Sequence, residues 1–404
     1  MELVVICSVV LAAVVVAALF AEVLARRWIR SGGKYFVWRP HYKKVEELNP
    51  AYSRFLESPI HFYANREGER GKEVPKTAGK LYRVLVAGGS TAECMKLNQD
   101  KAWPALLERI LEANKSLMDV DAIHVGNIAK SNVEGRGLSL TLEKVLPRYP
   151  RLDLVILVPG IAPVGRWLGD GCPADRPANP LPMRMLFAQY PEIEFGWGLK
   201  NTALAELTQR WLFRLTSHPQ RLTGVGRVKI AAASQRSTLK EFYPLIEDPS
   251  EMVSSFEKEL RVVLSLVQAK AKRVILVRPF WFAKDHFAAE EDANMWLGWV
   301  GKPKPGEQWQ YPSHQDLFRL YARLDQKSVK VAQEMEVEVI DLKGLLEARL
   351  GIYYDNCHLA EEGASIVAHY IASVVLGSSI IKMIPDEPSP AEVAPNIGGR
   401  LTTG

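Results

Sequence analysis

Two short segments, far apart in the chain, hold residue types that together could perform nucleophilic catalysis. Gly88-Gly89-Ser90-Thr91 lies in the first quarter of the sequence, and Asp355-Asn356-Cys357-His358 lies near its end. A serine hydroxyl becomes a nucleophile when an imidazole accepts its proton and a carboxylate orients that imidazole. Asp355 stands three residues before His358, so one loop can hold both side chains while the second ring nitrogen faces Ser90. We therefore predict that Ser90, His358 and Asp355 are catalytic.

The residues before Ser90 predict the element that positions it. Leu81–Ala87 is an apolar run typical of a buried strand, and the two glycines after it predict a turn. This places Ser90 at the mouth of a sheet, where α/β folds bind their ligands. Taken alone, a glycine turn before Ser or Thr is also typical of an ordinary helix start, and Asp355 could simply cap a helix. The occurrence of both segments in one chain favours catalysis.

The rest of the sequence alternates between strand-like and helix-like patterns, which predicts an α/β fold with a parallel sheet. Strand-like runs recur at residues 81–87, 122–125, 152–158, 273–277 and 337–340, with helical patterns such as 103–111 and 252–271 between them. Two stretches, about 161–249 and 281–314, are too long for simple connections and are interpreted as insertions near the site. Their tryptophans could line a substrate cleft, but local packing is the simpler interpretation.

The amino-terminal segment predicts one membrane-spanning helix. Leu3 to Ala21 is apolar except for Ser8, and about nineteen such residues match a hydrocarbon layer of roughly 30 Å. A cleaved signal peptide is the alternative, but a basic segment before the apolar run and a clear cleavage site are both missing. We expect residues 1–27 to form the anchor, 28–80 an irregular stem packed on the domain, and 385–404 a disordered tail. The arginines and lysine that follow the helix favour a cytoplasmic domain by the positive-inside rule.

Composition and motifs exclude several classes of function. The 404 residues include 51 basic and 46 acidic ones, and basic residues cluster only between Arg26 and Lys44, so nucleic-acid binding is not indicated. The four cysteines show no metal-binding spacing, and neither a P-loop nor a dinucleotide fingerprint follows the first strand. We therefore predict no metal and no organic cofactor. Cys94 and Cys357 flank the two site segments and could pair in an oxidising compartment, although two small packing residues are the favoured interpretation.

These segments resemble the SGNH or GDSL hydrolase superfamily, and in particular its membrane-anchored bacterial members with Gly-Gly-Ser-Thr in the first block. The resemblance extends over Ala21 to Arg26, Asn65 to Gly71, Gly88 to Cys94, Trp103-Pro104 and Asp355 to Gly363. It implies a three-layer α/β/α sandwich over residues 81–380 and acyl transfer through a serine intermediate. Ser90 would be the nucleophile, His358 the base and Asp355 its partner. Anchored members of the family usually face outward, so we expect an extracytoplasmic domain despite the charge bias.

The sequence departs from the family in its oxyanion donors. The family uses the amide of the serine, an amide from a second-block glycine and a third-block asparagine side chain. Here only the Ser90 amide is secure, and Asn132 occupies the glycine position of the second block. Asn tolerates the left-handed backbone that glycine would adopt, so the Asn132 amide can still point inward. Ala162-Pro163 replaces the third-block Asn-Asp, and we hypothesise that the side chain of Asn127 or Asn132 substitutes for the lost donor.

The resemblance implies an esterase or acyltransferase acting on an acyl ester, with an O-acetyl group of an extracytoplasmic glycan as one candidate. Loss of one oxyanion donor typically lowers turnover by about 10² to 10³. A catalytically silent protein that binds a glycan or a protein partner is therefore the alternative. Among the neighbouring residues, Glu93 is expected to face solvent, and Asn65 and Arg70 are expected to fix the stem by hydrogen bonds to the domain.

Overall fold

The computed structural model describes residues 2–52, 54–76, 79–175, 181–216, 219–239, 241–302 and 307–377. The tail expected at residues 385–404 lies outside these ranges, as does the end of the catalytic domain expected at residue 380.

A five-stranded sheet forms the centre of the molecule, and every pair of neighbouring strands in it is parallel. Its order is β4-β3-β5-β7-β8. The strands are β3 (Leu81–Gly88), β4 (Ala122–Asn127), β5 (Leu152–Val158), β7 (Ala271–Val277) and β8 (Glu338–Ile340). All five strand-like runs of the sequence are thus strands of one sheet, which confirms the predicted α/β class. Because β3 lies between β4 and β5, the turn after it follows an interior strand of the sheet and not an edge strand.

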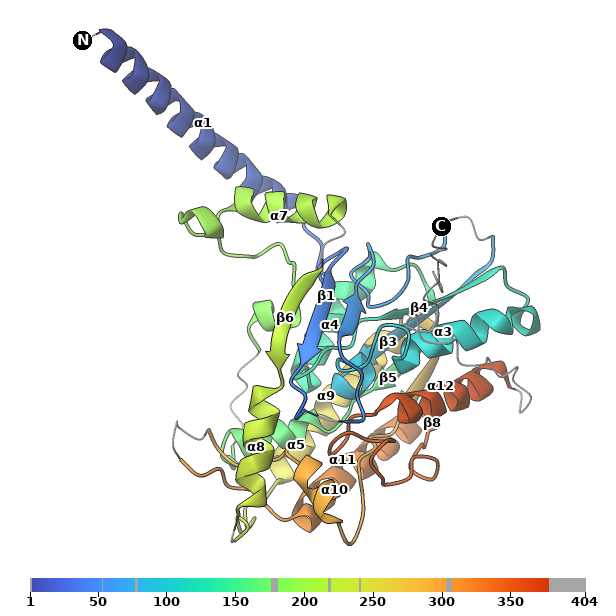
Figure 1. Cartoon of the computed structure of the whole chain (residues 1–404). Coiled ribbons are helices and arrows are strands. Elements are labelled where there is room, and N and C mark those ends of the chain that lie inside the picture. Colours follow the sequence, from blue (N-terminus) through green and yellow to red (C-terminus); the bar gives the residue numbers. More distant parts are fainter. Residues whose placement is uncertain are drawn as a thin grey trace, which may run out of the picture.

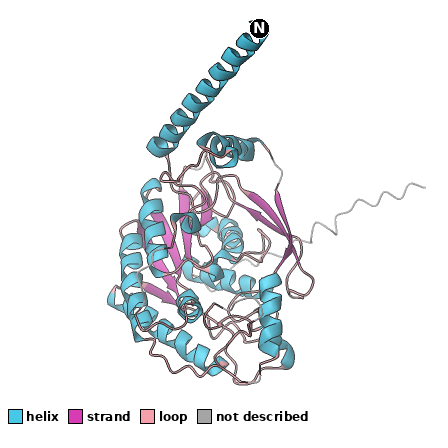
Figure 2. Ribbon diagram, turned by 90° about the vertical axis from the view of Figure 1, so that its left-hand side faces the viewer, coloured by secondary structure: helices cyan, strands magenta, loops and turns pink. Residues whose placement is uncertain are grey.

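Helices cover both faces of this sheet and complete a three-layer α/β/α sandwich (Figure 2). One face carries α3 (Trp103–Ala113) and α12 (Glu361–Leu376), and the other carries α4 (Gly135–Val145), α9 (Ser250–Gln268) and α11 (His314–Glu334). Side chains of a strand point alternately to its two faces. Along β3, Leu85 and Ala87 accordingly enter one core, whereas Val84 and Val86 enter the other.

The amino-terminal helix α1 (Glu2–Gly32) projects from this domain (Figure 1). Its Val4–Gly32 segment is long and apolar enough to cross a membrane, and a signal sequence would have the same properties. The side chains of its apolar half are largely exposed, which is the arrangement expected of a helix that meets lipid. The helix continues five residues beyond the expected end of the anchor at residue 27.

The expectation of an irregular stem was wrong in part, because the segment after α1 contributes two strands to a second sheet. In that sheet β1 (Lys43–Leu48) pairs antiparallel with β2 (Ile60–Tyr63) and parallel with β6 (Gln220–Val225). β1 has the sequence Lys-Lys-Val-Glu-Glu-Leu, which shows no apolar alternation. Its partner β6 lies more than 170 residues away in the chain, so no local pattern announces the pairing.

The remaining helices lie mostly in the two long segments that we interpreted as insertions. Between β5 and α9 the chain forms α5 (Ala162–Gly169), α6 (Met183–Leu186), α7 (Ala203–Leu215) and α8 (Arg227–Ser237), with β6 before α8. Between β7 and α11 it forms α10 (Ala289–Asn294). Short helices complete the fold: α2 (Ser90–Glu93), η1 (Lys115–Met118), η2 (Leu146–Arg148) and η3 (Leu199–Asn201). In Figure 1, α7 lies near α1 and α8 lies at the other end of β6.

Candidate active site

Ser90 begins helix α2 directly after the carboxyl end of β3. Gly88 makes this exit possible because it combines a φ of 147° with close packing against β5. A Cβ on Gly88 would lie 2.0 Å from the carbonyl oxygen of Val158, so no other residue fits there. The strand, the glycine turn and the short helix therefore hold Ser90 at the carboxyl end of the sheet, as the sequence predicted.

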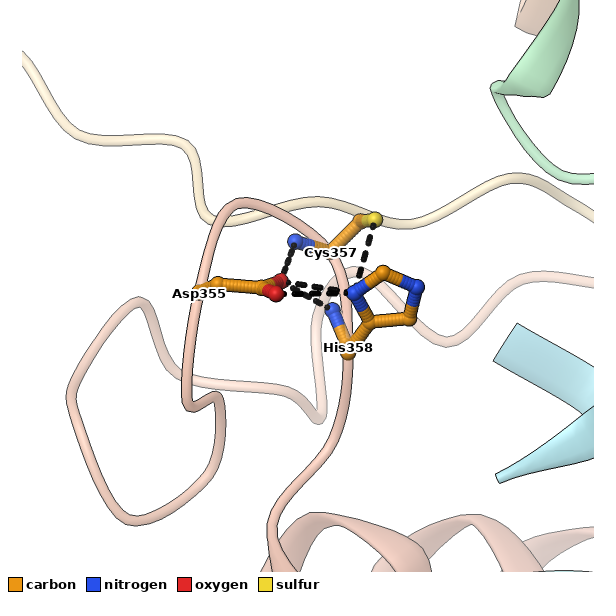
Figure 3. Close-up of side chains that lie close together, drawn as sticks. All are labelled: Asp355, Cys357 and His358. Atoms are coloured by element: carbon orange, nitrogen blue, oxygen red, sulfur yellow. Dashed lines mark hydrogen bonds and ion pairs between the residues drawn. The ribbon is translucent and has the colours of Figure 1, made fainter. Parts of the chain in front are cut away.

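Asp355 and His358 lie on the loop that precedes α12, and their side chains point toward each other (Figure 3). Both carboxylate oxygens of Asp355 lie 2.9 Å from His358 Nδ1. Oδ1 also accepts the backbone amides of Cys357 at 3.1 Å and His358 at 3.0 Å. The Asp355 side chain is fully buried, whereas the imidazole is 14% exposed. A carboxylate held by this many donors stays ionised and keeps one orientation.

The other ring nitrogen of His358 lies 2.7 Å from the hydroxyl oxygen of Ser90. The structure thus joins the three predicted residues, although 268 positions of sequence separate Ser90 from His358. Because ionised Asp355 can only accept hydrogen bonds, Nδ1 carries the ring proton and Nε2 accepts from the serine. This is the connectivity that a serine nucleophile with a general base requires.

Electrostatics tune both members of the pair. Burial alone would raise the pKa of Asp355, but the charge and hydrogen bonds of His358 lower it below its ordinary value. Burial likewise disfavours the imidazolium, yet the opposing charge of Asp355 raises the pKa of His358 well above 6.5. The neutral imidazole is therefore a stronger base than a free histidine, and it can take the Ser90 proton at a pH above this raised pKa.

Asp355, Cys357 and His358 lie close enough together to raise the question of a metal site, since their ligand atoms fall within 4.8 Å of one another. The donor set does not fit that role. Asp355 faces N–H groups, and Nδ1 of His358 faces the carboxylate. Burial raises the pKa of the Cys357 thiol, which opposes the thiolate form that metals bind. The residues fit proton transfer better than metal coordination.

The predicted oxyanion residues differ in whether their donor groups are free. Asn132 has a φ of 62°, the left-handed backbone that its position requires. Among the described residues, no hydrogen bond is found from the backbone amide of Ser90 or of Asn132, so both remain able to donate. The Asn127 side chain is instead engaged, because Nδ2 donates to the Ala92 carbonyl at 2.8 Å and Oδ1 accepts the Ala129 amide at 2.9 Å. It ties β4 to α2, which argues against an oxyanion role.

The third-block position contains no side-chain donor, as the sequence predicted. Ala162 and Pro163 form the first turn of α5. Gly160 before them has a φ of 68°, which is consistent with a tight turn at the end of β5.

Glu93 corrects one expectation, since it is buried rather than solvent-facing. Its carboxylate accepts hydrogen bonds from both the backbone amide and the hydroxyl of Ser131. Ser131 is the neighbour of Asn132. Glu93 therefore fixes the loop that carries the Asn132 amide, one of the two candidate oxyanion donors. Its position one helical turn after Ser90 was visible in the sequence, but its partner was not.

Arg70 behaves as predicted and joins the stem to the domain. Its guanidinium donates to the carbonyl oxygens of Glu93, Cys94 and Leu97, the last at 2.7 Å. These bonds hold the turn that follows Ser90. Asn65 differs from the expectation, because its side chain bonds to Glu69 and Lys72 within its own loop.

Two residues from the insertions reach the triad loop and were not singled out by sequence analysis as site residues. Trp296 donates its indole N–H to Asp355 Oδ2 at 3.0 Å. Lys229 of α8 donates to the carbonyl oxygens of Tyr52 at 2.8 Å and Tyr354 at 3.3 Å. Burial lowers the pKa of Lys229 to about 8, against the attraction of the Asp355 charge. Trp296 was among the tryptophans weighed as cleft residues, whereas no pattern marked Lys229.

The cysteines next to the site are free and buried. Cys94 packs in the core beneath α3 and α12, and Cys357 packs in the core on the opposite face of the sheet. This agrees with the favoured interpretation of two small packing residues.

No protein-family model and no curated protein match this chain. Among solved structures, it is similar to the acetylxylan esterase Axe2 from Geobacillus stearothermophilus, with 14% identity, a TM-score of 0.39 and coverage of 74% of this chain and 95% of that one. It is also similar to LAE5, an α/β hydrolase from the metagenome of Lake Arreo in Spain, with 15% identity, a TM-score of 0.39 and coverage of 74% and 98%. TM-scores of this size support no conclusion about activity.

Proposed function

We propose that this chain is a membrane-anchored SGNH-type serine hydrolase that acts on acyl esters, as an esterase or an acyltransferase. The observation that carries the proposal is the continuous hydrogen-bond chain from Ser90 through His358 to buried Asp355. An O-acetyl group of an extracytoplasmic glycan is the substrate class we put first, and the resemblance of the site blocks to anchored bacterial members is its support.

The chemistry follows from the positions of the protons. His358 Nε2 accepts the proton of the Ser90 hydroxyl as the oxygen attacks the ester carbonyl carbon. The amides of Ser90 and Asn132 are the donors available for the resulting oxyanion. The intermediate collapses as the C–O bond to the alcohol breaks and the imidazolium returns its proton to that alcohol. Water, or a second alcohol in a transferase, then attacks the acyl-serine by the same route and releases the acyl group.

The experiment is hydrolysis of p-nitrophenyl acetate by the purified full-length chain, beside the Ser90→Ala and His358→Ala variants. We expect turnover that falls to the uncatalysed level in both variants while their thermal unfolding stays unchanged. A short acyl chain is chosen because it makes the fewest demands on an unknown substrate cleft. Turnover that survives Ser90→Ala would contradict the proposed nucleophile.

A second candidate is a silent SGNH-fold protein that binds a glycan or a protein partner. The replacement of the third-block asparagine by Ala162 favours it, because one oxyanion donor is worth about 10² to 10³ in turnover. The Ala162→Asn variant separates the two candidates. An active enzyme should gain turnover from the restored amide, whereas a silent protein should show none before or after the change.

A further inference from the structure

Helix α7 (Ala203–Leu215) exposes its apolar face, which is the reverse of an ordinary surface helix. At 3.6 residues per turn, positions 204, 208, 211, 212 and 215 share one face. Leu204, Trp211, Leu212 and Leu215 on that face have exposed fractions of 37, 59, 44 and 60%. Thr208 is the polar residue of this face, and an exposed group of large apolar side chains of this kind marks an interaction surface.

The opposite face of α7 holds the polar contacts to the protein. Glu206 accepts from Arg39 at 3.1 Å and from Arg210 at 2.8 Å. Phe213 packs against the ring of Tyr42, with ring centroids 6.0 Å apart. This face therefore holds the helix to the domain, whereas Trp211 and Leu215 on the apolar face are more than half exposed.

The contacts between α7 and α1 place the exposed apolar side chains of α7 beside the end of the apolar run of α1. Both carboxylate oxygens of Glu22 accept hydrogen bonds from the first turn of α7, from Ala203 N at 2.8 Å and Leu204 N at 2.9 Å. Ala25 and Ile29 of α1 pack against Ala203. The continuous apolar run of α1 ends at residue 21, so α7 meets α1 directly after that run, in the last third of the Val4–Gly32 segment (Figure 1).

The residues around this crossing have the character of a membrane surface. Trp197 and Leu199, just before α7, are 65 and 91% exposed. Arg26 lies 4.3 Å from the centre of the Trp197 ring, and Arg27 and Arg30 are exposed on the same end of α1. Tryptophans and basic residues beside an apolar helix face are typical of helices that lie in the interfacial layer of a bilayer.

We propose that α7 is an interfacial helix, with Leu204, Trp211, Leu212 and Leu215 inserted among the lipids of the membrane that α1 spans. The proposal rests on the membrane anchoring proposed above, but not on the catalytic activity. Two contacts with the bilayer would hold the domain in one orientation, because α1 alone leaves it free to rotate and tilt. Since α8 lies at the other end of β6 from α7 and its Lys229 bonds to the triad loop, the candidate active site would then lie away from the lipid (Figure 1).

Nitroxide labelling of the full-length chain in phosphatidylcholine–phosphatidylglycerol vesicles tests this placement. Cys7 is the exposed cysteine of the described residues, so a Cys7→Ser background leaves three buried thiols. In that background, Leu215→Cys and Leu212→Cys report on α7. Leu345→Cys is the matched control, because it replaces a leucine of 42% exposure elsewhere on the domain. The accessibility of each label is measured with oxygen, which concentrates in lipid, and with a water-soluble nickel complex.

We expect oxygen to relax the labels at positions 212 and 215 severalfold more than nickel does, and the opposite at position 345. Preferential relaxation by nickel at 212 and 215 would overturn the proposal. Shielding from both reagents, with dipolar broadening between labels, would also overturn it by showing that a second copy covers the apolar face of α7. A label on Cys7 of the unaltered chain separates the membrane anchor from the interfacial helix. Preferential relaxation of that label by oxygen would support α1 as the anchor even if α7 proves to lie in water.

Discussion

Asp355 decides how the candidate site responds to pH. Its charge outweighs burial and raises the pKa of His358 well above 6.5. The imidazole acts as a base only when neutral, so kcat/KM should rise with pH through that elevated pKa and fall as the pH drops below it. A pH profile of ester hydrolysis measures this limb.

The Asp355→Asn variant checks the cause of the elevated pKa. Without the carboxylate charge, the acid limb of the profile should move to lower pH, and kcat should fall by about 10⁴ because the amide no longer fixes the tautomer. An unmoved acid limb in this variant would show that another group sets the pKa of His358.

Trp296 is expected to act as a positioning residue through its hydrogen bond to Asp355 Oδ2. Trp296→Phe removes the donor while keeping an aromatic ring, and a hydrogen bond to a charged group contributes about 1.5 to 3 kcal/mol. With one donor fewer, Asp355 should hold the imidazolium more strongly, so the acid limb should move to higher pH and kcat should fall.

Trp299→Phe is the matched control, because Trp299 stacks on Trp296 with ring centroids 5.9 Å apart and makes no hydrogen bond to Asp355. Kinetics in both variants across pH distinguish positioning from packing. Equal effects of the two substitutions would reduce Trp296 to a packing residue.

The turn between β3 and α2 contains two glycines, and only the first of them, Gly88, is required by the packing of the turn. Gly88→Ala would place a methyl group 2.0 Å from the Val158 carbonyl oxygen at a φ of 147°, so we expect a loss of at least about 2 kcal/mol in unfolding free energy. In Gly89→Ala the nearest atoms lie 3.8 Å away, and the change should be small. Urea unfolding of the two variants measures the difference, and similar losses would contradict the close-packed turn.

The elements that were predictable from sequence are those with a local signal. Strands β3 and β5 of the central sheet contain apolar runs at residues 84–87 and 154–158, as is typical of parallel strands buried on both faces, and the glycine turn before Ser90 follows from its residues. β1 carries four charged residues in six, and its partners are set by tertiary contacts, so a stem without regular structure was the wrong expectation. The burial of Glu93 escaped prediction for the same reason, because its partner Ser131 lies 38 residues away.

For the molecule as a whole, both long segments between sheet strands converge on the triad loop. The first supplies Lys229 and the second supplies Trp296. Sequence analysis placed these segments near the site but could not identify the contacts, because side-chain pairing across the fold leaves no local pattern. The division into anchor, stem and catalytic domain stays a prediction.

Lys229→Met tests the link between the first segment and the triad loop. It keeps the length of the side chain but leaves the buried carbonyls of Tyr52 and Tyr354 without this donor, which costs about 1 to 3 kcal/mol. We expect a loss of stability in that range together with a lower kcat. Lys80→Met is the control, because Lys80 pairs with Asp119 on the surface and should change stability little. Loss of stability with an unchanged kcat would show that Lys229 supports the fold alone.

The central claim is that Ser90 is an activated nucleophile, and labelling with a serine-reactive fluorophosphonate tests it most directly. The full-length chain, its Ser90→Ala and His358→Ala variants, and a Ser131→Ala control would be labelled and digested, and the modified peptide identified by mass. We predict labelling on Ser90 that is lost in the first two variants and kept in the control, since Ser131 bonds to Glu93 rather than to the imidazole. A folded protein that is not labelled, or is labelled at another serine, would contradict the account.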